Sequence, residues 1–485
     1  MSTRRAVLAD LGMGFVGLAL GAMLHRDGIA RAAAPDESGR SVARGLAVRQ
    51  PRAKRVIWLM MRGGVSHLES FDPKPAIDRH AGKTMGETPY RSAVFDSPHI
   101  KNVREQVANN IIDKHKARIY PTQTGFKRGG KSGIAVSDWW PHLRDQVDNI
   151  AVIRSMYTTD NNHGAQIEFL TGRHLLDGCF PTLGAWVHYG LGSLCDDLPQ
   201  FISLGPALES QCMGGVDASY LGPEHAGVVL KVDPDNPLPF ARPAAPVGRR
   251  EAAIKSEILG RLNGLAALEY PDDARLRARV QSYELAFRMQ TAVPELLRLA
   301  DEDASTRRLY GLDHDVTRPF GQQLLAARRL AERGVRFIQV FHGEGAAGAW
   351  DAHAGLRANH ATLSAQVDRP IAGLLVDLKR RGLLDDTIVV WATEFGRTPC
   401  AQGSDGRDHH NYGFSVWMAG GGIQGGIAHG ATDELGFHAV EHRHYVTDIH
   451  ATILHLLGLD SHRLEIPGRK RLEIEHGRPI REILV

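Results

Sequence analysis

Carboxylate and imidazole side chains gather beside glycines at four places in the chain. Mixed ligand sets of this kind suit zinc, manganese or iron, whereas carboxylates alone would favour magnesium or calcium. Each group by itself is more often an ordinary surface loop, so a metal or acid–base site is expected only where the fold unites them. The four segments are Asp160-Asn-Asn-His163, His342-Gly-Glu344 with Asp351-Ala-His353, Glu394-Phe-Gly-Arg397, and Asp405-Gly-Arg-Asp-His409-His410.

Short apolar runs precede or follow these four polar segments. They predict the β-strands that position the polar side chains. Continuous apolar runs bounded by glycine or polar residues are typical of strands buried on both faces of a parallel sheet. Ligands bind at the carboxyl ends of strands in open parallel sheets, so the polar segments are expected to share one sheet edge. The predicted strands are 55–61, 149–154, 336–341, 387–391 and 414–419.

Helical patterns alternate with these strands. The alternation predicts an α/β fold with a doubly wound, mostly parallel sheet flanked by helices. Residues 86–135 are irregular, basic and glycine-rich, and we expect a surface excursion there; a helical insertion is expected near 250–334. The predicted helices cover 181–191, a long region from about 251 to 334, 369–381 and 446–457.

The amino terminus is typical of an export signal. Arg4-Arg5 precedes an apolar run from Leu11 to Leu24 and a small-residue segment, Ala30-Arg-Ala-Ala-Ala34. The run is shorter than the ~20 residues that cross a bilayer, and the paired arginines indicate a twin-arginine signal. We therefore expect a signal peptide over 1–34, a flexible lead-in over 35–53, and a periplasmic or extracellular protein whose mature chain has no transmembrane segment.

The composition narrows the class of protein. With 485 residues, 43% of them hydrophobic, the chain is globular rather than disordered, collagenous or coiled-coil, and its net charge of +3 gives no reason to expect nucleic acid as a partner. Four cysteines are too few for a disulfide scaffold; an oxidising compartment permits one bridge, Cys179 with Cys195 or Cys212. The 24 histidines fit a metal or acid–base site.

Three segments resemble sulfatases. They are Arg369 to Gly396, Leu170-Thr-Gly-Arg173 and Thr447 to Gly458. Residues 54–485 are more similar still to the sulfatase-like family called domain of unknown function 1501. The residues that carry this likeness are Gly63-Gly64-x-Ser66, Phe71-Asp-Pro-Lys74, Asn162-His-Gly164, Glu394-Phe-Gly-Arg-Thr398 and Gly403-Ser-Asp-Gly-Arg-Asp-His-His410. The resemblance implies the alkaline phosphatase superfamily fold and transfer of a sulfuryl or phosphoryl group at a metal site.

The same resemblance implies a set of metal ligands. Asp351 and His353 resemble the Asp and His that bind one metal in the superfamily, and Glu394 falls where a ligand Asp would be. His409 and His410 precede a strand as the superfamily's last ligand His does, and one of the two is expected to bind. The implied cofactor is a divalent metal, zinc or manganese first, with one or two ions left open.

The chain also departs from the superfamily pattern. Arg62 stands where an Asp ligand usually follows the first strand, and Phe395 replaces a ligand histidine. Asn162 occupies the position of the sulfatase nucleophile, so formylglycine chemistry is not expected. These changes preserve a single-metal site and weaken the case for two-metal chemistry.

The expected catalytic residues are His163, Asn162, Arg62 and Arg397. His163 could be a ligand, a general acid, a nucleophile or only a helix-start hydrogen-bonding group. The two arginines could clamp an anion, although Arg397 could equally pair with Glu394. Other hydroxyls near the site that could attack are Ser66, Thr158 and Thr159.

The predicted function is an exported metal-dependent hydrolase of an anionic sulfate or phosphate ester, with sulfated polysaccharides as one candidate substrate. The alternative is a catalytically inactive protein of the same fold that binds an anionic glycan or an envelope partner. The missing nucleophile favours the alternative, and the retained Asp, His and Glu set opposes it. A redox enzyme has no support beyond the histidine count.

Overall fold

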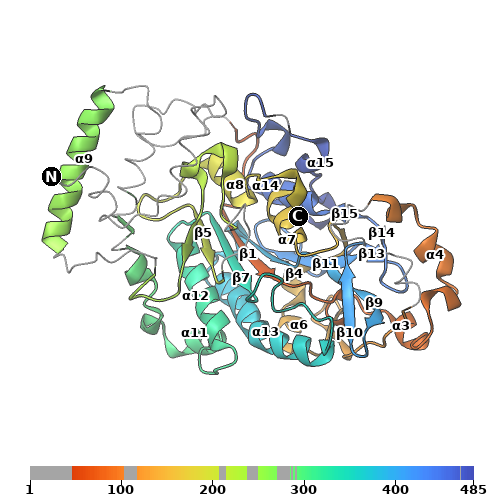
Figure 1. Ribbon diagram of the computed structural model, residues 1–485. Coiled ribbons are helices and arrows are strands. Elements are labelled where there is room, and N and C mark those ends of the chain that lie inside the picture. Colours follow the sequence, from red (N-terminus) through yellow and green to blue (C-terminus); the bar gives the residue numbers. More distant parts are fainter. Residues whose placement is uncertain are drawn as a thin grey trace.

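A nine-stranded sheet runs through the centre of the described part of the computed structural model (Figure 1). The structure describes residues 46–102, 117–206, 215–237, 249–269, 285, 288–289, 292–469 and 471–485. The strand order is β12-β4-β11-β8-β1-β7-β5-β6, with β15 also paired to β4. The strands are β1 (Arg55–Met61), β4 (Ile150–Tyr157), β5 (Phe201–Leu204), β6 (Val228–Leu230), β7 (Phe337–His342), β8 (Thr387–Ala392), β11 (Phe414–Ala419), β12 (Ile427–His429) and β15 (His444–Tyr445).

Within this sheet β11 runs against its neighbours β4 and β8, and the other pairs are parallel. The predicted mostly parallel α/β sheet is therefore confirmed, and the five predicted strands correspond to β1, β4, β7, β8 and β11. Because β11 is reversed, it begins at the edge where the parallel strands end. Residues before β11 therefore share that edge with residues after β4, β7 and β8.

Alternate side chains of β1 enter two separate cores. Ile57 and Leu59 pack in the cluster that contains α12 (Arg318–Glu332) and α13 (Leu356–Arg380). Val56 and Trp58 pack in the cluster that contains α8 (Leu183–Leu191) and α14 (Val446–Leu456). Successive side chains of a strand point to opposite faces, so an uninterrupted apolar run is what a strand covered on both faces requires.

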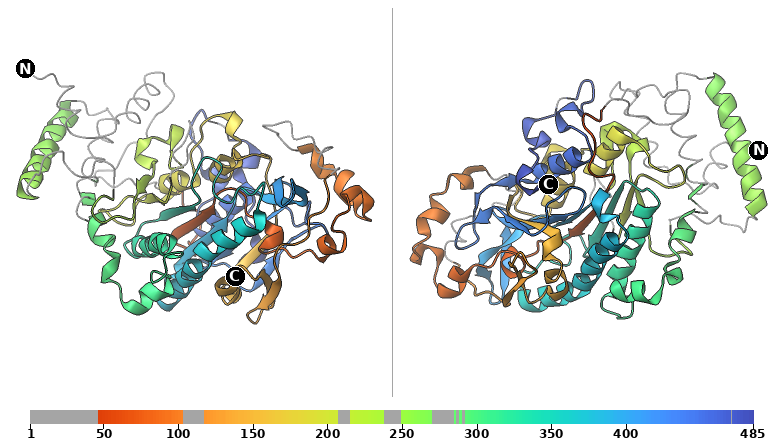
Figure 2. Two further views of the ribbon diagram at one scale, coloured as in Figure 1. Left: turned by 60° about the horizontal axis from the view of Figure 1, so that its bottom comes forward. Right: turned by 180° about the vertical axis from the view of Figure 1, so that it is seen from behind.

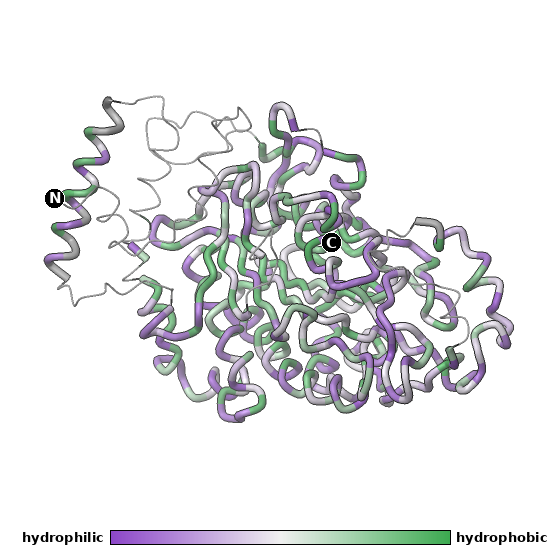
Figure 3. Tube along the Cα trace, in the orientation of Figure 1, coloured by the Kyte–Doolittle hydropathy of each residue, from purple (hydrophilic) through white to green (hydrophobic). Residues whose placement is uncertain are grey.

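Helices cover both faces of the sheet. In Figure 1, α11 (Ala304–Leu309), α12, α13 and α6 (Pro141–Arg144) lie below the sheet, and α7 (Ala165–Thr171), α8, α14 and α15 (Glu473–His476) lie above it. Figure 2 shows the same layers from two other directions. The strands between them form the apolar centre of Figure 3, and polar segments lie mostly outside.

The predicted helices over 181–191 and 446–457 correspond to α8 and α14. The helix predicted over 369–381 is only the second half of α13, which starts at Leu356 and contains Pro370. Proline is most favourable in the first turn of a helix, so Pro370 indicated a helix that starts at residue 369. In the structure the helix starts 13 residues earlier, at Leu356.

The region from about 251 to 334 contains α9 (Arg249–Glu269), α11 and α12, with parts outside the described residues. The helix α9 stands at one side of the molecule (Figures 1 and 2). Its Ile258, Leu262 and Leu265 are 52%, 58% and 64% exposed. The described residues therefore do not bury the apolar face that the spacing of these residues predicts.

Smaller elements surround the sheet. The excursion near 86–135 includes a short helix, a hairpin and residues 103–116, which lie outside the described part; Ile119 forms a β-bridge with Cys400. The remaining elements are α3 (Pro75–Arg79), α4 (Arg91–Phe95), the hairpin β2 (Phe126–Gly129) with β3 (Ile134–Ser137), the hairpin β9 (Gly396–Gln402) with β10 (Gly406–His410), and β13 (Ala431–Thr432) with β14 (Ala439–Glu441).

The predicted signal peptide over 1–34 and the lead-in up to residue 45 lie outside the described residues. In the part that the structure describes, no helix combines the length and apolarity that spanning a bilayer requires. Cys179 is disulfide-bonded and Cys195 is a free thiol, so the expected alternative of a Cys179–Cys195 bridge is wrong. Cys212 lies outside the described residues.

Candidate metal centre

Loops from one edge of the sheet supply the candidate residues. The loop after β4 carries Asn162 and His163, and the loop between β7 and α13 carries Asp351 and His353. Glu394 lies two residues after the end of β8. The β9–β10 hairpin, which precedes the reversed strand β11, supplies His409 and His410, the last two residues of β10.

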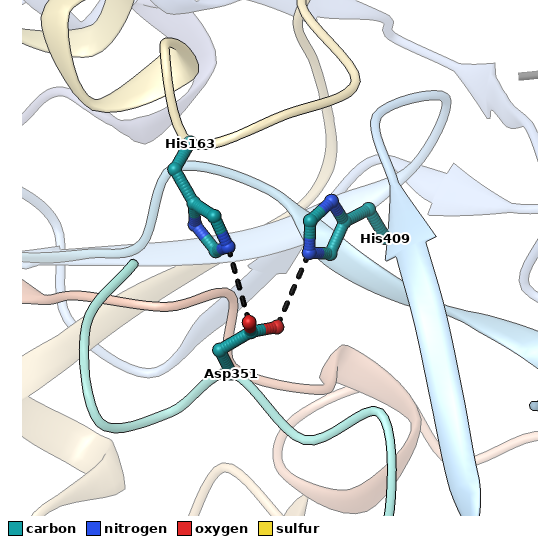
Figure 4. A group of neighbouring side chains, drawn as sticks. All are labelled: His163, Asp351 and His409. Atoms are coloured by element: carbon teal, nitrogen blue, oxygen red, sulfur yellow. Dashed lines mark hydrogen bonds and ion pairs between the residues drawn. The ribbon is translucent and has the colours of Figure 1, made fainter. Parts of the chain in front are cut away.

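The carboxylate of Asp351 is the centre of the group. Its Oδ1 lies 3.1 Å from Nε2 of His353 and 3.2 Å from Nε2 of His409. Its Oδ2 lies 3.3 Å from Nε2 of His163. Figure 4 shows His163 and His409 directed at this carboxylate from two sides. Three imidazole nitrogens from three segments of the chain thus converge on one carboxylate.

The far nitrogen of each ring is held by an atom that only accepts hydrogen bonds. Nδ1 of His163 donates to Oε1 of Glu394 at 3.1 Å, and Nδ1 of His409 donates to the carbonyl of Asn161 at 3.0 Å. Nδ1 of His353 donates to the side-chain oxygen of Gln402. A second proton, on Nε2, is donated to Asp351. When that proton leaves, the neutral ring keeps its proton on Nδ1 and has a lone pair on Nε2. This is the tautomer that binds a metal through Nε2.

These donors fit a divalent metal. Ligand atoms of His163, Asp351 and His409 all lie within 4.8 Å of one another, and those of His353, Asp408 and His409 form an overlapping group. Two imidazoles and one carboxylate suit zinc or manganese, and three protein ligands leave a coordination position for another molecule, as in catalytic zinc sites.

The electrostatics of the group favour a positive charge. Burial lowers the pKa of His163, but hydrogen bonds to Asp351 and Glu394 outweigh it and raise that pKa to about 9. Burial raises the pKa of Asp351, yet hydrogen bonds from the three histidines hold it far below its usual range. The pKa of His409 is lowered, mainly by burial. A proton or a metal ion therefore balances the carboxylates at neutral pH.

Glu394 lies behind His163 rather than beside Asp351. Its side chain is fully buried, and Oε1 accepts hydrogen bonds from the backbone N–H of Gly63 at 2.8 Å and from Nε2 of Gln166 at 3.1 Å, besides that from His163. In the described residues it belongs to neither group of possible ligands. The geometry gives Glu394 the task of orienting His163.

His410 is separated from the group by the pleat of β10. Its Nε2 donates to the carbonyl of Phe437, and its ring packs on Phe437 and Tyr412. Neighbouring residues of a strand face opposite sides, so only one of two adjacent histidines can reach Asp351. The structure places His409 there.

Both arginines of the predicted anion clamp are buried and engaged. The Arg397 guanidinium donates to Oδ1 of Asp351 at 2.8 Å and to the carbonyls of Gly63 and Gly64. Arg62 donates to the carbonyls of Gly343 at 3.1 Å and Gly345 at 2.6 Å. In this structure both guanidinium groups fasten the loops that carry the ligands.

Asn162 and two of the three candidate hydroxyls are also engaged. The side-chain oxygen of Asn162 accepts a hydrogen bond from the backbone N–H of His163 at 2.8 Å. Ser66 donates to Glu69 and Thr159 donates to Glu168, both buried carboxylates. Thr158 is 2% exposed.

Sequence reasoning missed three groups that hold the cluster in place: Gln402, Gln166 and the carbonyl of Asn161. Gln402 is on β9 and faces His353 across a loop, and no local motif marks it. A backbone carbonyl leaves no trace in residue type. Only Asn161 lay inside a segment already singled out, two residues before His163.

The fold and this cluster define an α/β protein with a histidine–carboxylate group at the carboxyl edge of its sheet that could hold a divalent metal. The chain belongs to the family described as protein of unknown function, DUF1501, which matches residues 53–484. A comparison with curated proteins finds no match.

Solved structures similar to the chain include enzymes of the sulfatase and alkaline phosphatase type. A sulfatase from a Pseudoalteromonas species is 13% identical, with 93% of this chain and 76% of that chain covered and a TM-score of 0.36. A phosphonate monoester hydrolase from Silicibacter pomeroyi is 16% identical, with 71% of each chain covered and a TM-score of 0.35. The alkaline phosphatase of the Antarctic bacterium TAB5 is 10% identical, with coverages of 84% and 98% and a TM-score of 0.28.

Proposed function

We propose that this protein is an exported, zinc- or manganese-dependent hydrolase of sulfate or phosphate esters. The observation that carries the proposal is the convergence of His163, His353 and His409 on Asp351 through Nε2. The ester class rests on the sulfatase-like segments, and export rests on Arg4-Arg5 and the apolar run that follows. A sulfated polysaccharide would be one natural source of such esters.

In this proposal His163, Asp351 and His409 hold the cation. A bound zinc or manganese ion supplies a Lewis acid that polarises the ester and stabilises charge developing on the transferred group. Glu394 keeps the proton of His163 on Nδ1, so that Nε2 stays available. Arg397 keeps the Asp351 carboxylate in place.

His353 is the residue we assign to proton transfer. Its side chain is 38% exposed, against 10% for His409 and 17% for His163, so it is the imidazole that a substrate reaches most easily. The hydrogen bond to the Asp351 carboxylate raises its pKa, so the ring holds its proton more firmly than a free histidine. Asn162 cannot form a covalent ester, so we expect direct attack by water.

The test combines metal analysis with ester hydrolysis. Mature protein purified without chelator should contain about one metal per chain. His409→Ala should lose the metal, whereas His353→Gln should keep it and hydrolyse 4-nitrophenyl sulfate or 4-nitrophenyl phosphate at least about 100-fold more slowly. His410→Ala is the matched control, because its ring lies on the other side of β10, and it should keep the metal.

The same experiment distinguishes the hydrolase from the alternative, a catalytically inactive protein that binds an anionic glycan. The side chain of Asn162, at the position of the sulfatase nucleophile, favours it. A metal-loaded wild type that binds a sulfated glycan but cleaves no sulfate or phosphate ester would replace hydrolysis by binding. A well-folded wild type without metal would remove the hydrolase mechanism altogether.

A further inference from the structure

A second group of charged residues lies away from the candidate metal centre, in the helical layer below the sheet in Figure 1. A cavity of about 500 Å³ opens between α6, α11 and the second half of α13. Its volume is in the range of pockets that hold small ligands. The metal centre precedes α13, and at 1.5 Å per residue Arg369 and Arg380 lie roughly 20 and 36 Å along that helix from its start. A ligand in the cavity would not reach the metal centre.

The charge of the cavity is predominantly positive. Arg308, Arg369 and Arg380 line it, and Asp145 is the one carboxylate among its lining residues. Arg369 is held in place, because its guanidinium donates to the carbonyl of Arg308 and lies 3.3 Å from Asp313. Arg308 and Arg380 are exposed, and among the described residues their guanidinium groups have no hydrogen-bonding or ion-pair partner.

The spacing of the arginines defines the ligand. Arg369 and Arg380 are 11 residues apart, which is close to three full turns, so they share one face of α13 and lie about 16 Å from each other along the axis. One anionic group cannot bridge that distance. Between them the same face presents Val376 and small residues, and Leu309 of α11 adds apolar surface. Guanidinium groups bind sulfate and phosphate in a bidentate manner, and the apolar strip suits the carbon face of a sugar ring.

We propose that this cavity binds a sugar or short oligosaccharide that carries several sulfate or phosphate groups. The proposal goes beyond the hydrolase function, because it needs neither the metal nor the residues that hold it. If the ester substrate is a polymer of the same chemistry, binding here would keep a second part of the chain on the enzyme and raise the effective concentration at the metal centre.

The experiment measures binding of two defined probes, sucrose octasulfate and inositol hexakisphosphate, to the full mature protein by calorimetry at low salt. We expect saturable binding of at least one probe, and the stronger of the two identifies sulfate or phosphate as the preferred group. Arg308→Ser/Arg380→Ser should weaken binding at least about tenfold, or 1.4 kcal/mol. Asp145→Asn should strengthen it, because the repelling carboxylate is removed.

Two controls separate this site from the metal centre. Arg463→Ser removes an exposed arginine elsewhere that has no side-chain partner in the described part of the chain, and should leave binding unchanged. His409→Ala should also bind normally, whether or not the protein proves to be a hydrolase. No saturable binding, equal binding by the double arginine variant, or loss of binding in His409→Ala alone would each overturn the proposal.

Discussion

Glu394 and His163 form a hydrogen bond of 3.1 Å between Oε1 and Nδ1, and the opposite nitrogen of the same ring lies 3.3 Å from Asp351. One buried carboxylate thus sets the tautomer of a ring that faces a second carboxylate. The two acidic residues therefore have different roles. Asp351 is available to bind a cation, and Glu394 determines which nitrogen of His163 can bind the same cation.

Glu394→Gln should weaken metal binding without abolishing it. The amide carries no charge to stabilise the Nδ1 proton, and such changes behind a ligand histidine typically cost about 10- to 100-fold in metal affinity. Competition with a chromophoric chelator measures the change directly. The exposed Glu441 on β14 provides the control, Glu441→Gln, with unaltered affinity expected. If Glu394→Gln binds metal as tightly as the wild type, the orienting role is wrong.

Arg397→Met should destabilise the fold as well as the site. The guanidinium is fully buried, and its loss removes the donor that the carbonyls of Gly63 and Gly64 share with the Asp351 carboxylate. Removing one partner of a buried ion pair costs about 3–5 kcal/mol. Urea unfolding should show this loss. The exposed Arg357 at the start of α13 is the control, and Arg357→Met should change the free energy of unfolding little; equal unfolding midpoints for the two variants would contradict the assignment.

Gly63→Ala should displace the Asp351 loop. Gly63 has φ of +119°, and a Cβ there would lie 2.7 Å from the backbone carbon of Trp350 and closer still to the backbone nitrogen of Asp351. Backbone cannot yield as a flexible side chain can, so both stability and metal affinity should fall. Gly403, with φ of +63° and no atom within 4 Å of an added Cβ, is the matched control. Gly403→Ala should cost only about 1 kcal/mol and keep the metal.

Stability should fall as the pH drops below the unfolded-state value of histidine. Burial lowers the pKa of His188, His438 and His450 to about 4 each, and of His225 to about 3. Below about pH 6.5 these four histidines become protonated in the unfolded chain but stay neutral in the folded protein. Each histidine therefore lowers the free energy of unfolding by up to about 1.4 kcal/mol per pH unit, until the pH reaches its pKa in the folded state.

The pH dependence of unfolding by urea between pH 7 and 4.5 tests this reasoning. His450→Gln should show a shallower fall than the wild type, because one of the four groups no longer titrates. His314→Gln, which changes an exposed histidine, should follow the wild-type slope. A wild type whose stability is level or rises over this range would show that these rings are protonated in the folded protein.

The sequence predicted the sheet well because β1, β7 and β8 are buried on both faces and therefore apolar at most positions. The sheet edge that carries the site followed from the same strands. The first half of α13 was missed because Pro370 resembles a helix start, although tertiary packing accommodates it inside the helix. The local sequence pattern does not show whether tertiary packing will accommodate a proline inside a helix.

Individual roles in the site were harder to predict than its location. Whether His409 or His410 faces Asp351 depends on the pleat of β10, and the partner of His353 depends on how Gln402 lies across a loop. Arg62 and Arg397 were predicted to bind an anion because their positive charge can be read from the sequence. The backbone carbonyls that accept their hydrogen bonds can be identified only in the folded structure. Residue type identifies donors and acceptors, but only the fold pairs them.

The reversal of β11 has a consequence for how the protein could be loaded with metal. It brings a hairpin from late in the chain to His163 and Asp351, so the three proposed ligands enclose segments of 188 and 58 residues, taken as 351 − 163 and 409 − 351. A cation at this point would act as a removable cross-link, comparable to a disulfide between distant parts of the chain. Loss of the ion would then free the β9–β10 hairpin and the loop that carries His163 from each other. In the metal-free protein, proteases should cut first in this hairpin and in this loop.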